Sequence, residues 1–275
     1  MPSGVAQLPL PKLVRSEADG VVAWTDRALE PLGVTVGFSE RSGGVSVAPY
    51  SSLNVAGHVG DDPSAVSENR RRLLAALGLD RETSIVVPRQ VHGVDIVDVA
   101  LRDPLEGFEA DGLFSIGSGP LLLLCFADCV PVVLAGPGPS VAVLHAGWRG
   151  VIGGIAGDGV RRVVERTGGP PDSINVYIGP HIGIDSFQVD PALAARFSSS
   201  FGERSVVEAA TEKPRVDLAE AVRTDLARAG VDPERIAALS VDTAGGVDRF
   251  FSYRAEGGRT GRHGAFAHVT RLAKI

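Results

Sequence analysis

Short apolar runs separated by turn residues alternate along the chain with longer stretches in which apolar residues recur every three or four positions. The first pattern is typical of strands and the second of amphipathic helices. We expect strands at residues 21–24, 34–38, 84–87, 95–101, 121–127, 132–135, 141–145, 175–178 and 237–241. Helices are expected at residues 61–78, 151–168, 191–201 and 218–229, where acidic caps or prolines open a segment or glycines close it. The pattern predicts a mixed α/β (α+β) fold with mixed sheets flanked by helices.

The ends and loops of the chain give a simple domain organisation. We expect residues 1–20 to form a flexible N-terminal arm, and the rest of the chain, long enough for one large or two small domains, shows no interdomain linker. The Gly- and Ser-rich segment 39–54 is longer than most connections, which fits a binding loop or an ordinary surface excursion equally well. The tail, residues 250–271, carries the polar segments 252–254 (SYR) and 260–263 (TGRH), which are polar enough to line a site but too irregular to identify one.

Composition narrows the class of protein. The longest apolar run, residues 120–127, is far shorter than the roughly 20 residues that cross a membrane. The first residues lack the basic and apolar regions of a secretory signal, so a cytoplasmic protein is expected. A net charge of -6 offers no positive field for a nucleic acid polymer. Cys125 and Cys129 lie four apart in an extended segment, too distant from each other for a disulfide.

Three residues suggest chemistry: His92, Cys129 and His145. Each lies where a predicted strand breaks, and glycine or proline follows each within two residues. Two imidazoles and a thiolate suit zinc, and three protein ligands leave a fourth position open for water or substrate. Pairing Ala135 with Ser140 across the turn between two predicted strands would put His145 opposite Val130, one residue from Cys129. The hairpin therefore predicts that thiol and imidazole are neighbours.

Other interpretations fit the same residues. Cys129 can act as a nucleophile with His145 or His92 as its base and Asp128 as the orienting group, as in cysteine hydrolases. After His145, a glycine-rich helix start carrying Arg149 suits an anion such as phosphate. A purely structural pair of Arg149 with its neighbouring tryptophan fits that spacing equally well.

Seven segments, in order along the chain, carry a resemblance to a known family. They are residues 54–63 (NVAGHVGDDP), 68–73 (ENRRRL), 89–93 (RQVHG), 110–112 (ADG), 127–129 (ADC), 145–150 (HAGWRG) and 178–180 (IGP). From about residue 21 to its end the chain resembles the YfiH-like family, whose members are named multicopper polyphenol oxidases, laccases or purine nucleoside phosphorylases.

The resemblance implies that residues 21–275 form a single YfiH-like catalytic domain of mixed α/β fold, and it also implies a function and a cofactor. The family's zinc ligands fall on His92, Cys129 and His145, with one zinc per chain and copper as a substitute in vitro. Purine nucleosides and phosphate are the implied partners: the implied reaction is phosphorolysis of adenosine, inosine, guanosine or methylthioadenosine. Deamination of adenosine at the same site is also implied. Zinc-activated water can attack C6 of adenine, and phosphate can attack C1′ of the ribose.

Roles beyond the ligands are hypotheses. Asp128 is a candidate general acid/base beside the metal, and Arg149 and Arg89 are candidate phosphate ligands. The nucleoside is expected to contact Asn54, Gln90 or Trp148. Many family members have cysteine where this chain has His181 and Asp242, so any contribution of those thiols is absent here.

The sequence also separates the alternative functions. A multicopper oxidase needs on the order of ten histidines in His-x-His pairs, whereas this chain has six histidines, no such pair and one methionine. Copper-dependent polyphenol oxidation is therefore the least favoured activity. An amidohydrolase that edits peptidoglycan precursors remains an alternative, because it can use the same metal. We expect a monomer.

Overall fold

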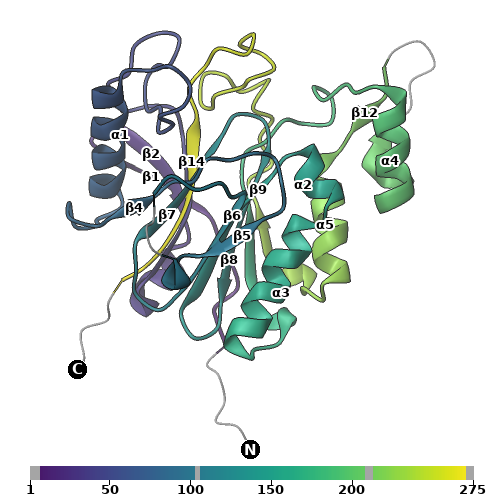
Figure 1. Ribbon diagram of the computed structural model, residues 1–275, viewed down its shortest axis with the longest axis horizontal. Helices are drawn as coiled ribbons and strands as arrows, with labels where there is room; N and C mark the ends of the chain where they lie inside the picture. Colours follow the sequence, from purple (N-terminus) through teal and green to yellow (C-terminus); the bar gives the residue numbers. More distant parts are fainter. Residues whose placement is uncertain (1–6, 103–105, 208–212, 271–275) are drawn as a thin grey trace, which may run out of the picture.

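The computed structural model describes residues 7–102, 106–207 and 213–270, and within them most strands belong to two six-stranded sheets (Figure 1). The first sheet has the order β1 (Val14–Ala18), β2 (Val21–Thr25), β3 (Val34–Ser39), β14 (His263–Val269), β7 (Leu121–Phe126), β4 (Ile85–Val86). The second has the order β13 (Ile236–Ala238), β10 (Asn175–Ile178), β8 (Val130–Gly136), β9 (Ser140–Ala146), β6 (Gly112–Ile116), β5 (Ile96–Asp98). Two short strands, β11 (Val206–Val207) and β12 (Arg215–Val216), form a separate ribbon.

The helices cover the outer faces of the two sheets, as Figure 1 shows. On the first sheet lies α1 (Pro63–Ala76); on the second lie α2 (Trp148–Ile152), α3 (Ile155–Thr167) and α5 (Leu218–Arg228), and α4 (Pro191–Phe201) packs outside them against α2, α5 and the ribbon of β11 and β12. The Asp62 side chain caps α1 and Pro63 occupies its first turn, as the sequence predicts. The helix expected at 151–168 is two helices, because Gly154 in the left-handed region (φ 79°) separates α2 from α3.

Side chains alternate strictly between the layers. In β7, Leu122, Leu124 and Phe126 point into the core between the sheets, whereas Leu121, Leu123 and Cys125 pack towards α1. In β9, by the same rule, Val141 and Val143 enter the core between the sheets, and Ala142 and Leu144 pack under α3. Apolar residues on both faces explain why these strands read as continuous hydrophobic runs. The mixed α/β fold class predicted from sequence is confirmed.

Several expectations need correction. Within the expected N-terminal arm, residues 14–18 form β1 and pair with β2, while residues 1–6 lie outside the described part. The polar tail contains β14, a central strand between β3 and β7, and β6 lies in a segment where no strand was expected. Polar positions such as His263 and His268 broke the apolar pattern of β14, although both are buried. β7 and β8 also belong to different sheets. Residues 127–129 therefore connect one sheet to the other and are not a break within a single strand.

The hairpin register differs by one residue from the predicted one. Gly136 pairs with Ser140, and His145 faces Pro131 instead of Val130. Because side chains alternate, a shift of one residue exchanges the faces of a strand. In the observed register, the side chain of Pro131 lies on the same face of the hairpin as that of His145. Cys129 is two residues before Pro131, so its side chain belongs to the same face.

Two further features concern the cysteines and the helices. Both cysteines are free, as expected. None of the described helices is long and apolar enough to cross a membrane.

The close approach of the two sheets makes Gly179 a test of the fold. A Cβ added there would stand 2.5 Å from Cδ1 of the buried Phe38. We expect Gly179→Ala to lower the free energy of unfolding by about 1–3 kcal/mol through overpacking. Gly57→Ala is the matched control, since a Cβ at Gly57 meets nothing within 4 Å. Urea denaturation measures both, and an equal effect of the two substitutions would contradict this account of the packing.

Candidate metal centre

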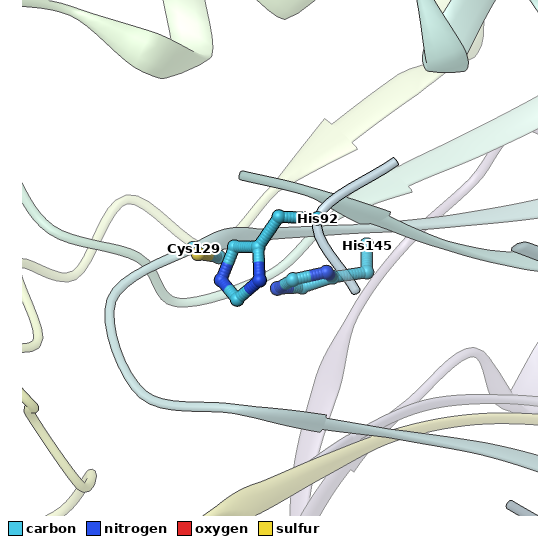
Figure 2. Close-up of side chains that lie close together, drawn as sticks. All are labelled: His92, Cys129 and His145. Atoms are coloured by element: carbon cyan, nitrogen blue, oxygen red, sulfur yellow. The ribbon is translucent and has the colours of Figure 1, made fainter. Parts of the chain in front are cut away.

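His92, Cys129 and His145 converge at one end of the layer between the sheets. His145 lies near the end of β9, Cys129 immediately precedes β8, and His92 lies in the loop between β4 and β5. One ligand atom from each lies within 4.8 Å of the other two (Figure 2). His145 is buried, Cys129 is partly exposed and His92 is exposed. Among the described residues, this is the group of His, Cys, Asp or Glu side chains that could hold a metal ion.

A fully buried carboxylate, that of Asp111, holds two of these ligands in place. Its Oδ1 lies 2.7 Å from Nδ1 of His145 and accepts a hydrogen bond from the backbone N–H of His92 at 2.9 Å. Its Oδ2 accepts hydrogen bonds from the N–H groups of Val91 and Gly93. These bonds fix the loop in which His92 takes a left-handed conformation, with φ 61°.

The same carboxylate selects the histidine atom that faces the metal. Burial raises the pKa of Asp111, but hydrogen bonds from His145 and the loop outweigh it, so the pKa lies below its usual value. An ionised carboxylate can only accept, so Nδ1 of His145 must donate and Nε2 is left for a metal.

Glycine at position 147 keeps the space between the ligands open. A Cβ there would stand 3.0 Å from Cδ2 of His92 and 3.2 Å from Sγ of Cys129. Any larger residue would therefore press on both ligands, which explains the glycine between His145 and α2.

The thiol and the imidazole shift each other's ionisation. Burial raises the pKa of Cys129, but the charge and hydrogen bond of His145 and a hydrogen bond from His92 lower it to about 6. Burial lowers the pKa of His145, while Cys129 and Asp111 raise it to about 9. The cluster therefore favours a thiolate, which is the form of cysteine that binds metals.

The cluster opens into a cavity of about 430 Å³. Its lining includes the three ligands together with His58, Gln90, Cys125, Ala127, Asp128, Ile182, Phe187, Tyr253, Arg254 and Arg262. This volume lies in the range of small-molecule binding sites. The cavity therefore offers a substrate-sized space directly at the ligands.

Two further residues proposed from sequence reach this cavity. Gln90 donates to the carbonyl of Cys125 (3.0 Å) and accepts from its N–H (2.8 Å), which ties the His92 loop to β7. Asp128 has a positive φ of 92°. Its carboxylate accepts hydrogen bonds from the hydroxyls of Thr243 and Ser252 and from the N–H of Arg254. These contacts fix the turn that precedes Cys129.

The other four predicted residues do not line the cavity. Arg149 is exposed and stacks over Trp148, whose centroid lies 4.2 Å from the guanidinium carbon. Arg89 is exposed and pairs with Glu109 at 3.2 Å. Asn54 is fully buried. Its amide bonds the backbone of Ala56, the carboxylate of Asp61 and the N–H of Arg262.

Sequence reasoning assigned no role to four residues that the structure brings to the site: Asp111, His58, Tyr253 and Arg262. Asp111 and His58 do lie in segments that carry the family resemblance, 110–112 and 54–63. Arg262 and Tyr253 lie in the two polar segments of the tail, 252–254 and 260–263, which the sequence marks as polar enough to line a site without identifying one. Only the packing of that tail onto the end of β7 reveals their position.

Removal of the Asp111 carboxylate tests its positioning role. We expect Asp111→Asn to weaken metal binding by about 10–100-fold, because it frees the His92 loop and changes the preferred tautomer of His145. Competition with a chromogenic chelator measures the affinity. Asp95→Asn, an exposed neighbour, is the control and should keep the affinity of the wild type. Unchanged affinity in Asp111→Asn would show that the loop is held by other contacts.

The pKa of Cys129 can be measured in metal-free protein. With a pKa of about 6 the group is mainly thiolate at pH 7.5, so iodoacetamide labelling should plateau above about pH 7 and fall as the pH drops through 6. His145→Asn should raise the pKa and slow labelling at pH 7. Peptide mass spectrometry separates Cys129 from Cys125, a buried thiol whose pKa is raised to about 11. A labelling rate that still climbs between pH 8 and 9 would contradict the pairing with His145.

Comparison with known proteins supplies the family. The family model for the multi-copper polyphenol oxidoreductase laccases matches residues 35–270. The purine nucleoside phosphorylase YlmD of Geobacillus stearothermophilus is 37% identical over 270 residues, which cover 94% of this chain and 97% of that protein. The purine nucleoside phosphorylase YfiH of Escherichia coli K12 is 35% identical over 245 residues, with 86% and 94% covered.

Solved structures agree with this assignment. The crystal structure of YlmD from Geobacillus stearothermophilus matches with a TM-score of 0.84 at 36% identity, covering 95% of this chain and 100% of that chain. The crystal structure of the Bacillus licheniformis hypothetical protein YfiH gives a TM-score of 0.83 at 30% identity, covering 92% and 98%. The resemblance found in the sequence is confirmed, and the chain belongs to the multi-copper polyphenol oxidoreductase laccase family, alongside the YfiH and YlmD proteins.

Proposed function

We propose that this protein is a zinc-dependent purine nucleoside phosphorylase that also deaminates adenosine at the same site. The observation that carries the proposal is the His92, Cys129 and His145 cluster at the wall of a cavity of about 430 Å³. Relatives that match most of the chain are named purine nucleoside phosphorylases, which supports the substrate class. Adenosine, inosine, guanosine and methylthioadenosine are the proposed nucleosides.

The ligand set fits zinc. Two imidazoles and a thiolate are preferred zinc ligands, and the Asp111 carboxylate behind His145 is the usual second partner of a metal-binding histidine. Bound at these three residues, zinc would supply Lewis acidity and lower the pKa of water.

The cavity residues position the substrates for two reactions. In phosphorolysis, a phosphate oxygen forms a bond to C1′ of the ribose. The bond from C1′ to the purine nitrogen breaks, and the base leaves with the electron pair and takes up a proton. In deamination, water adds at C6 of adenine and ammonia leaves. Asp128 remains our proposed acid/base because it lines the cavity, although its three hydrogen bonds support a positioning role first.

A second candidate function has an observation of its own. One ligand atom of Cys129 lies within 4.8 Å of one of His145, and Nδ1 of His145 lies 2.7 Å from Oδ1 of Asp111. This order of thiolate, imidazole and carboxylate is that of a cysteine hydrolase. Here Asp111, and not Asp128 as expected, is the orienting group. His92 on the same thiolate favours the metal, because a nucleophilic cysteine needs only one base.

Polyphenol oxidation has less support than the family description suggests. A multicopper oxidase assembles several copper ions from many histidines. In the described residues, the possible metal ligands form one group of three. The monomeric state and the cytoplasmic location stay predictions from the sequence.

Metal content and phosphate dependence test the proposal together. We expect about one zinc per chain by elemental analysis and release of adenine and hypoxanthine from adenosine and inosine only when phosphate is present. Cys129→Ala should lose both the zinc and the activity, because two histidines alone hold zinc weakly. Cys125→Ala is the matched thiol control and should keep its zinc, since Cys125 is outside the ligand group.

The alternatives predict different results. Zinc without nucleoside turnover would favour an amidohydrolase acting on peptidoglycan precursors. Protein that purifies without metal and carries a reactive Cys129 would favour the cysteine hydrolase.

A further inference from the structure

Arg262 is built into the wall of the cavity by its backbone. Its N–H donates to Oδ1 of Asn54 at 2.9 Å, and its carbonyl accepts from the N–H of Val55 at 3.1 Å. Its side chain is also anchored: Nη1 donates to the carbonyls of Thr260 (2.7 Å) and Gly261 (2.9 Å). The guanidinium is therefore a fixed cation, with its remaining N–H groups available to the cavity that it lines.

This cation lies close to the metal ligands. In the antiparallel pairing of β14 with β7, His263 faces Phe126, so the preceding Arg262 lies at the end of β7 from which the turn to Cys129 starts. Burial lowers the pKa of Arg262, and charges on Cys125, Cys129 and Asp128 are near enough to act against that shift. A molecule bound at the metal ligands would thus lie within reach of this cation.

Arg262 lacks a counter-ion. In the described part of the chain, no carboxylate forms an ion pair with its guanidinium. The carboxylate that lines the cavity, that of Asp128, already accepts from Thr243, Ser252 and Arg254. A cation that is partly withdrawn from water and has no counter-ion is unfavourable, and a bound anion relieves that cost.

His58 adds a neutral hydrogen-bonding group to the same cavity. It lines the same space, and its pKa is lowered by burial and by the charges of Arg262, Arg70 and His145. Its imidazole is therefore neutral at pH 7 and offers one N–H donor to an anion.

We propose that Arg262, assisted by His58, forms the subsite for the phosphate co-substrate of the nucleoside phosphorylase, an assignment that rests on the proposed function above. The guanidinium binds the phosphate dianion through charge-assisted hydrogen bonds and holds it beside the reacting C1′. No proton passes through Arg262, because a guanidinium stays protonated. Arg149 and Arg89, the sequence candidates, lie outside the cavity and already contact Trp148 and Glu109.

The 5′-phosphate of a nucleotide has the same chemistry as free phosphate. We assign the subsite to free phosphate because the proposed reaction consumes it. Kinetics with inosine and phosphate, compared with inosine 5′-monophosphate alone, separates these two sources.

The test compares Arg262→Met and Arg262→Lys with Arg259→Met in zinc-loaded protein. Arg259 is an exposed arginine of the same loop that does not line the cavity. We expect Arg262→Met to raise the KM for phosphate about 10–100-fold, because the phosphate loses a charged hydrogen-bonding partner. The KM for inosine should stay within about 2-fold of wild type. Arg262→Lys should fall between, because it keeps the charge without the planar fork. Arg259→Met should match wild type.

A direct binding measurement separates this inference from the proposed function. Titration calorimetry with inorganic phosphate and no nucleoside should show binding to wild type and its loss in Arg262→Met at unchanged zinc content and melting temperature. Binding that depends on Arg262, without any nucleoside turnover, would support the anion subsite and overturn the proposed function.

Other outcomes would overturn the inference alone. Phosphate-dependent turnover with an unchanged KM for phosphate in both Arg262 variants would do so, as would phosphate binding that depends on zinc but not on Arg262. Loss of phosphate binding in Arg149→Ala or Arg89→Ala, with Arg262→Met normal, would return the subsite to the sequence candidates. Faster turnover of inosine 5′-monophosphate, lost in Arg262→Met, would assign the subsite to a nucleotide.

Discussion

The Asp111 carboxylate is the interaction on which the site depends. Asp111 immediately precedes β6 of the second sheet. Its two oxygens accept hydrogen bonds from the His92 loop, and Oδ1 also faces Nδ1 of His145. One buried group thus fixes the backbone of one ligand and the tautomer of another. A buried carboxylate is tolerated only when its oxygens are satisfied, so the loop and the imidazole stabilise Asp111 as much as it positions them.

The layered fold explains why the ligands meet where they do. His145 has the parity of Val141 and Val143, which point into the layer between the sheets, and it lies at the open end of that layer. Residues 127–129 leave the first sheet at the same end and enter the second. His92, Cys129 and His145 therefore lie where apolar packing ends and a cavity begins, and Gly147 leaves the space beside His92 and Cys129 open.

Charge is distributed unevenly around that cavity. Its one lining carboxylate among the described residues, Asp128, is saturated by donors, whereas Arg262 has no ionic partner. The candidate metal ligands and the partly buried Arg262 cation both line this cavity. Such a cavity suits a substrate pair in which one member is an anion and the other a flat, neutral heterocycle.

The sequence by itself determined the strands with continuous apolar runs, the capped helices and the three residues that could hold a metal, because periodicity, capping residues and ligand chemistry are local properties. The family resemblance followed from motifs that are likewise local. Only the tertiary structure shows the contacts of Asp111 and the hairpin register that places Cys129 on the same face as His145. It also shows the position of β14, which the sequence pattern does not indicate because its buried histidines interrupt the apolar run. It also shows that the cavity is lined by Arg262 and not by Arg149, Arg89, Asn54 or Trp148. These features depend on which distant segments of the chain pack side by side. The local pattern of side chains along the sequence does not determine that packing.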